Sequence, residues 1–120
     1  MTRRGPGSET SEVGELPPRN GGDVLVALER FDLRIPGCTS LKEKRHVVKT
    51  LTSAIRQKFN VSVAEVDHHD LWQRTALAVA VASGDGYHAK RVLHEVERLV
   101  ERWAEVEMID AELTLHAPED

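Results

Sequence analysis

Basic side chains gather in one segment of the chain, residues 40–59, which reads SLKEKRHVVKTLTSAIRQKF. Six Lys and Arg residues are opposed there by one acid, Glu43, although the whole chain has a formal net charge of −4. Such a concentration of positive charge is typical of a surface that binds phosphate or an acidic protein, but also of an ordinary solvated helix face. The candidate binding residues in this segment are Lys42, Lys44, Arg45, Lys49 and Arg56.

The segment must be a helix if these side chains are to act together. Ser40 and Glu43 have the S-x-x-E spacing of a capping box, which predicts a helix start at Ser40. At about 100° per residue, four of the candidate cations fall together beside an apolar stripe. Several lie in the first turns, where the helix dipole disfavours cations, and this favours a binding role. The stripe consists of Leu41, Val48, Leu51, Ile55 and Phe59.

A second polar stretch, residues 67–74, reads DHHDLWQR. Its Asp and His side chains are of types that bind metals, but four consecutive turn residues point in different directions and no Cys accompanies them. We therefore expect no metal and no cofactor, with ion pairing to Lys42 or Arg45 as the simpler role. Trp72 is predicted to cover the edge of the core. The residues expected to border the basic surface are His68, Asp70, Trp72 and Arg74.

Nothing in the sequence specifies a catalytic reaction. Cys38 precedes the helix, where the pKa of a thiol can be lowered, but no base or orienting partner accompanies it. An acylphosphatase-like enzyme would need a Gly-rich phosphate cradle with an Arg at this loop, and IPGCTSLKEKR does not supply one. The sequence therefore predicts a protein that is not an enzyme.

Hydrophobic periodicity predicts the remaining elements. Strands are expected at residues 23–35, 61–67, 75–83 and 107–115, and a second helix from the turn at 84–86 to Trp103. The resulting β-α-β-β-α-β order predicts an α+β, ferredoxin-like sandwich with strand order 4-1-3-2 and both helices on one face of an antiparallel sheet. This topology brings the loop at 36–40 and the hairpin at 67–74 to the same end of the sheet.

The first strand is apolar on both faces at its beginning. Val24, Val26 and Leu28 are predicted to lie on the sheet face that no helix covers. We therefore expect a homodimer through this open face.

Composition predicts one domain at residues 23–116, between a disordered tail at 1–22 and a frayed end at 117–120. The tail has no apolar core of a signal peptide, and no apolar run is long enough to span a membrane. The single cysteine, Cys38, excludes an intrachain disulfide and fits a reducing cytoplasm.

Two long motifs, FDLRIPGCTSLKEKR and FNVSVAEVDHHDLWQR, are similar to those of the YlxP-like bacterial proteins, catalogued as domain of unknown function 503. The resemblance covers residues 24–115 and implies a ferredoxin-like fold. Family genes often lie beside those for transcription elongation, translation initiation and ribosome maturation, which implies an RNA or ribosomal partner. No activity is established for the family, so the resemblance implies no catalytic residue.

RNA contact is expected through phosphates alone. An RNA-recognition motif would need aromatic residues on the open faces of its central strands, and the strand at 75–83 has none. The alternative to an RNA partner is a small-ligand or protein-interaction module of ACT type, suggested by the Pro36-Gly37 turn after the first strand.

Overall fold

The structure is a computed structural model, and it describes residues 24–118. The predicted disordered tail at 1–22 and the last two residues of the predicted frayed end lie outside this range. Ala117 and Pro118 have no regular secondary structure.

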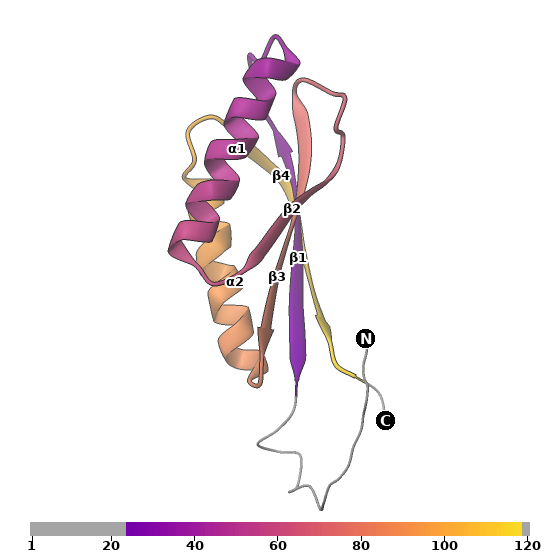
Figure 1. Cartoon of the computed structure of the whole chain (residues 1–120), viewed down its shortest axis with the longest axis vertical. Helices are drawn as coiled ribbons and strands as arrows, with labels where there is room; N and C mark the ends of the chain where they lie inside the picture. The colour runs from indigo at the N-terminus through magenta and orange to yellow at the C-terminus, as the bar shows by residue number, and fades with distance from the viewer. Residues whose placement is uncertain (1–23, 119–120) are drawn as a thin grey trace, which may run out of the picture.

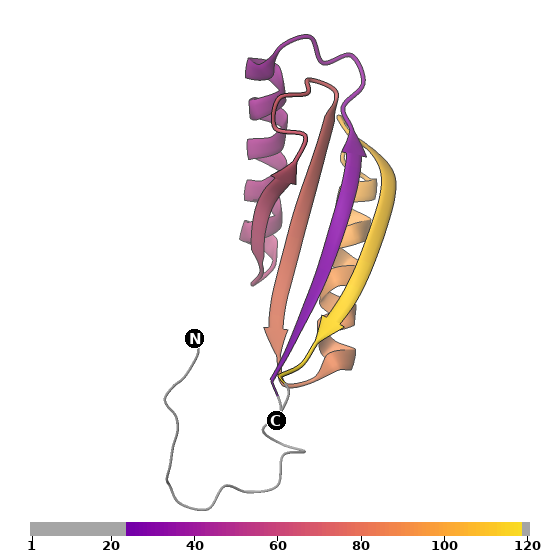
Figure 2. The same ribbon diagram turned by 90° about the vertical axis from the view of Figure 1, so that its right-hand side faces the viewer.

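All six predicted elements are present and in the predicted order. The sheet order is β2-β3-β1-β4 with every neighbouring pair antiparallel, which is the predicted order read from the other edge. Both helices cover one face of the sheet (Figure 1), and the other face is open (Figure 2). The fold is therefore ferredoxin-like, as predicted. The elements are β1 (Leu25–Arg34), α1 (Leu41–Lys58), β2 (Ser62–Asp67), β3 (Arg74–Ser83), α2 (Gly86–Glu101) and β4 (Glu107–His116).

The predicted capping box of α1 is half formed. Ser40 Oγ accepts a hydrogen bond from the Glu43 backbone N–H at 3.1 Å, as expected for an N-cap. The Glu43 carboxylate, however, accepts from the backbone N–H and the hydroxyl of Thr39, one residue earlier than the predicted partner. The Glu43 side chain thus holds Thr39, the residue before the N-cap, in place.

The core lies between the helices and the inner face of the sheet. Residues at alternate positions of β1 point inward, and they form one buried cluster with apolar side chains of α1 and α2. α2 packs on β1, β3 and β4, while α1 packs on β2 at one edge of the sheet (Figure 2). Fully buried members of this core include Phe31, Leu33, Leu51, Ile55, Leu77, Leu93, Val96 and Val100.

A register shift changes which residue of β4 faces the core. Strand alternation predicts Ile109 on the same face as Ala111, but the pairing with β1 shifts between Asp32 and Leu33, so that Leu33 lies opposite Met108. Met108 packs against the core and Ile109 is exposed. The prediction for Ile109 was wrong because a β-bulge, which adds a residue to one strand, cannot be read from alternation alone.

The loop after β1 and the hairpin between β2 and β3 meet at one end of the sheet, as the topology predicted. The Ile35 backbone N–H donates to the Gln73 carbonyl at 2.9 Å. The Gln73 side-chain amide donates to the Cys38 carbonyl at 3.1 Å. Gly37 has a φ of +76°, a left-handed conformation that lets the chain turn between these contacts.

Candidate nucleic-acid interface

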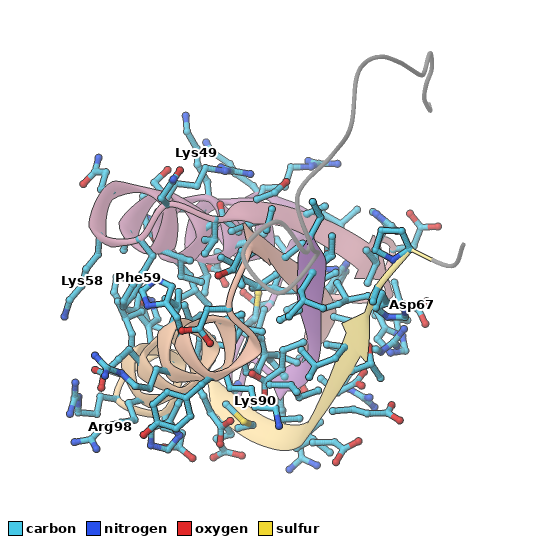
Figure 3. All side chains as sticks on the ribbon, turned by 90° about the horizontal axis from the view of Figure 1, so that it is seen from below. Lys49, Lys58, Phe59, Asp67, Lys90 and Arg98 are labelled. Atoms are coloured by element: carbon cyan, nitrogen blue, oxygen red, sulfur yellow. The ribbon has the colours of Figure 1, made fainter. Side chains whose placement is uncertain are left out.

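Four cations share one side of α1: Lys42, Arg45, Lys49 and Arg56, here called the α1 basic face. All four are exposed, and Lys49 extends away from the body of the protein (Figure 3). Within residues 24–118, none of Lys42, Arg45 and Lys49 forms an ion pair. The positive charge of these three side chains is therefore directed to solvent.

Arg56 has a contact that the other three lack. Its guanidinium donates a hydrogen bond to the carbonyl of Val63 in β2 at 2.8 Å. Arg56 thus links the C-terminal half of α1 to the strand beneath it. Its charge stays on the exposed side of the helix, but its position is fixed.

Lys44, which was expected on the binding surface, lies inside the protein with its side chain 3% exposed. Its Nζ is 3.0 Å from Glu65 Oε2 and also donates to the His68 carbonyl. The Thr75 hydroxyl donates to the same Glu65 oxygen at 2.7 Å. Burial raises the pKa of Glu65, but the hydrogen bonds from Thr75 and Lys44 outweigh burial, so the pKa is lowered overall. Lys44 therefore joins α1 to the β2–β3 hairpin.

A groove of about 420 Å³ lies between α1 and the hairpin. Arg45 and Lys49 line one wall, and His69 and Asp70 line the other. The Lys44–Glu65 ion pair also lines this groove, and its two charges cancel each other. The structure thus brings together three of the exposed residues that the sequence singled out, namely Arg45, Lys49 and Asp70, along one groove.

Trp72 does not cover the core, contrary to the prediction. Its side chain is half exposed, and it does not belong to the buried cluster. Together with Asp70, Leu71 and Arg74 it lines a shallow hollow on the hairpin. The hairpin turns at His68, whose φ of +62° lies in the left-handed region.

His68 and Arg74 belong to a different cluster, on the open face of the sheet. Arg30 pairs with Asp32 at 3.1 Å and with Asp67 at 3.2 Å, and His68 and Arg74 also approach Asp32. The hydrogen bond from Arg30 lowers the pKa of Asp32. The pKa of Asp67 is lowered first by the His68 backbone N–H and then by Arg30.

This open-face cluster corrects the predicted ion pairs of the hairpin. Asp67 pairs with Arg30 of β1 and not with Lys42 or Arg45 of α1. Figure 3 shows why, because Asp67 lies on the open side of the sheet while Lys49 lies on the helix side. One side of the hairpin therefore contacts β1 on the open face of the sheet, and the other side lines the groove beside α1.

A second groove, of about 660 Å³, lies where the loop after β1 meets the start of α1 and the turn before β4. Pro36, Gly37 and Val47 give it apolar walls, and Lys42 and His46 stand at its edge. Cys38 is also in the wall, buried, with its thiol donating to the Ser40 carbonyl. This is the position at which the sequence suggested a small-ligand module.

Glu29 is a buried acid that the sequence reading missed. It occupies an inward position of β1 and is 3% exposed, and within the described chain its Oε1 has no hydrogen-bond donor. Burial, a hydrogen bond with Glu97 of α2 and repulsion from that carboxylate raise the pKa of Glu29 to about 8. Alternation could have found it, since Glu29 lies between the inward positions of Ala27 and Phe31.

Two other features can be stated for residues 24–118. No three side chains of the His, Cys, Asp and Glu types come together there in a way that could hold a metal ion. Neither helix in this range has the length and apolar character needed to cross a membrane.

The sequence profile of the family described as Protein of unknown function (DUF503) matches residues 26–113. The chain is also 37% identical over 83 residues to a protein of Bacillus subtilis strain 168 described as Uncharacterized protein YlxP; this covers 69% of the chain and 90% of that protein. The chain belongs to the DUF503 family.

Solved structures with similar chain folds are distant in sequence. The designed protein LFR1 1, described as having a ferredoxin fold, is 15% identical with a TM-score of 0.42, covering 80% of this chain and 86% of its own. SnoaB, a cofactor-independent oxygenase from Streptomyces nogalater, is 11% identical with a TM-score of 0.42, covering 82% and 96%. A dimeric ferredoxin-like protein from an uncultured marine organism is 10% identical with a TM-score of 0.42, covering 86% and 93%.

Proposed function

We propose that this protein is a non-enzymatic cytoplasmic accessory protein that binds RNA or a ribonucleoprotein surface through the α1 basic face. One observation carries the proposal. Lys42, Arg45 and Lys49 form no ion pair within the described chain, although the chain as a whole is acidic. Cations kept free of internal partners on one helix face supply the electrostatic attraction that a phosphate backbone requires.

The contact is with backbone phosphates. Arg45 and Lys49 can each donate to phosphate oxygens along the groove beside the hairpin. Base readout would need aromatic platforms on the open sheet face, and β3 offers mostly alanine there. Trp72 is half exposed on the hairpin and can stack on one unpaired base next to this groove.

The test is a charge reversal at the centre of the groove. Arg45→Glu with Lys49→Glu should abolish binding to a short labelled single-stranded RNA and to purified bacterial ribosomes. The matched control is Arg91→Glu with Arg98→Glu, because both residues are exposed on α2 and the net change in charge is identical. If both double variants lose RNA binding equally, the loss is due to the net charge of the protein and not to the α1 basic face. If the wild type binds no RNA at low salt, the proposal is wrong.

A small-ligand module of ACT type is the second candidate, because the groove beside Pro36 and Gly37 has a volume of about 660 Å³ and apolar walls. Such a module would bind a small metabolite saturably at this loop, with little dependence on Arg56. A thermal-shift screen of cellular metabolites separates the two candidates. A metabolite that stabilises the wild type but not a Val47→Trp variant, in which the indole fills the groove, would favour the module.

A further inference from the structure

The two edges of the sheet differ in how well they are protected from pairing with another strand. β2 is short, its pairing shifts between Glu65 and Asp67, and Arg56 donates to its Val63 carbonyl. Short length, irregular register and covering side chains are the ways in which proteins block an edge strand. β2 is therefore a blocked edge.

β4 lacks these protections over most of its length. It has ten residues, Glu107–His116, and the described chain pairs only one of its sides, with β1. Its register shift is confined to the beginning, between Met108 and Asp110, so residues 110–116 run without interruption. The outer side of this stretch offers regular backbone donors and acceptors to another strand.

Apolar side chains flank the same stretch. Leu113 lies opposite Glu29 and Leu115 opposite Ala27, so both leucines point to the helix-covered face. They are nevertheless 37% and 41% exposed, although α2 packs on β4. Tyr87, at the start of α2, is 72% exposed, and Leu115 lies close to the preceding Gly86. The isolated chain thus leaves an apolar strip in water beside an unpaired strand.

We propose that a second copy of this chain pairs with this edge, β4 against β4, antiparallel about a two-fold axis at Leu113. The two sheets then continue into one, with all helices on the same face. The apolar strips of the two copies meet between the two α2 helices, where each copy covers the leucines of the other. A two-fold interface of this kind needs a strand that is complementary to itself.

The charges of β4 exclude most other registers. Opposite residues of an antiparallel pair point to the same face, so the axis must pass through a residue. An axis at Ala111 would place Asp110 opposite the Glu112 of the second copy, and an axis at Glu112 would place that residue opposite itself. Like charges directly opposite are destabilising. An axis at Thr114 avoids this repulsion, but it shortens the paired stretch and brings Pro118 into it.

The register centred on Leu113 satisfies these conditions. It places Asp110 opposite His116 and Glu112 opposite Thr114, so neither acid faces a like charge. On the other face it places Leu113 opposite Leu113 and Ala111 opposite Leu115. The paired stretch is residues 110–116, the part of β4 that has no register shift.

The open face of the sheet is the competing surface for a second copy. Of the three residues predicted there, Val26 and Leu28 alternate with the inward residues of β1 and Val26 is exposed, while Val24 is exposed just before the strand. The other half of that face holds the cluster of Arg30, Asp32 and Asp67, and a face-to-face dimer would remove these charges from water at considerable cost. On the helix-covered face of the β4 edge, Glu29 lies opposite Leu113, but it is only 3% exposed in the single chain, so strand pairing does not have to remove it from water.

Disulfide trapping tests the register directly. Opposite Cα atoms in an antiparallel pair are about 4.5–5.5 Å apart, which is within the range that a disulfide spans. In a Cys38→Ala background, Leu113→Cys should form a covalent dimer under mild oxidation. Thr114→Cys and Val26→Cys, made in the same background, should stay monomeric on a denaturing gel. Crosslinking of Val26→Cys with none of Leu113→Cys would assign the second copy to the open face and overturn the proposal.

Sedimentation tests the equilibrium with a matched pair of variants. Leu113 and Val26 are both 37% exposed, so a lysine costs the isolated chain a similar amount at either site. At tens of micromolar, the wild type and Val26→Lys should be dimers and Leu113→Lys a monomer. A monomeric wild type at this concentration, or a dimeric Leu113→Lys, would contradict the β4 interface. If Leu113→Lys fails to fold, the crosslinking experiment alone decides.

Discussion

Lys44 Nζ lies 3.0 Å from Glu65 Oε2, so that a cation expected on the surface forms an ion pair between α1 and β2. The same ammonium donates to the His68 carbonyl, and Thr75 completes the contacts of Glu65. The buried ammonium of Lys44 therefore connects α1 to β2 and to the turn of the β2–β3 hairpin. A buried charge with a complete set of partners is tolerated, whereas one that has lost its partner is costly.

Lys44→Met should destabilise the protein by about 2–4 kcal/mol, because it leaves the Glu65 carboxylate partly buried with no cation. Chemical denaturation at neutral pH measures this loss. Lys44→Met with Glu65→Leu should recover most of it, since both charges are then removed. Lys49→Met, on the exposed side of the same helix, is the control and should change stability little; an equal loss at Lys49 would contradict the assignment.

Stability should fall as pH rises from about 4.5 to 8, because of Glu29. Its pKa is raised in the folded protein from an ordinary value of 4.5 to about 8, so in this window the folded state holds a proton that the unfolded state has lost. Glu29→Gln keeps the shape of the side chain without the titration. It should flatten the pH profile and add about 1–3 kcal/mol at pH values near 9.

Denaturation curves collected across this pH range measure the slope. Glu95→Gln, on the exposed side of α2, should leave the wild-type slope intact. Glu97→Gln should reduce it, because Glu97 supplies both a hydrogen bond and a repelling charge to Glu29. A wild-type profile without any slope would mean that Glu29 is ionised in the folded protein.

Gly37→Ala should cost about 1–2 kcal/mol for reasons of backbone conformation alone. The φ of Gly37 is +76°, while a Cβ added there would meet nothing within 4 Å. Gly37→Asn should cost less, since asparagine tolerates the left-handed region better than alanine does. Thermal unfolding of the two variants gives the comparison, and an alanine variant as stable as the wild type would show that the loop adopts another conformation.

Affinity for single-stranded RNA should fall linearly on a plot of log affinity against log salt concentration. Each neutralised phosphate contributes about 0.7 to the slope, through release of its counterion. Lys49→Ala alone should reduce the slope by about that amount if Lys49 contacts one phosphate. Fluorescence anisotropy over a salt series measures it, with Lys58→Ala as the control, because Lys58 lies over the Phe59 ring on another side of α1.

Most of the fold followed from hydrophobic periodicity. The alternation of apolar residues in β1 and their helical spacing in α1 can be read from the sequence alone. The rules for connecting strands and helices then leave one arrangement of the six elements. The bulge at Ile109 could not be predicted, since an extra residue in one strand depends on how two strands pair. The contact of Glu43 with Thr39 likewise depends on the loop before the helix.

The candidate site was predicted less completely than the fold. The exposed cations Lys42, Arg45 and Lys49 are where the helical wheel puts them, and the same wheel puts Lys44 within the apolar stripe, on the buried side of α1. The number of cations in a helix therefore does not predict which of them are exposed, and Lys44 is buried. Topology predicts that the end of β1 and the hairpin meet, but not the cluster around Asp32, because its ion pairs depend on which face of the sheet each hairpin side chain takes.

The strand order β2-β3-β1-β4 sets how the two proposed surfaces combine. α1 packs on β2, at the opposite edge from β4, so a second copy bound at β4 leaves the α1 basic face uncovered. The paired molecule would then present two such faces at the two ends of one continuous sheet. A nucleic acid long enough to reach both ends would bind the second face at the high effective concentration set by the first. The same weak contact would thus discriminate RNA by its length and shape, without reading a single base.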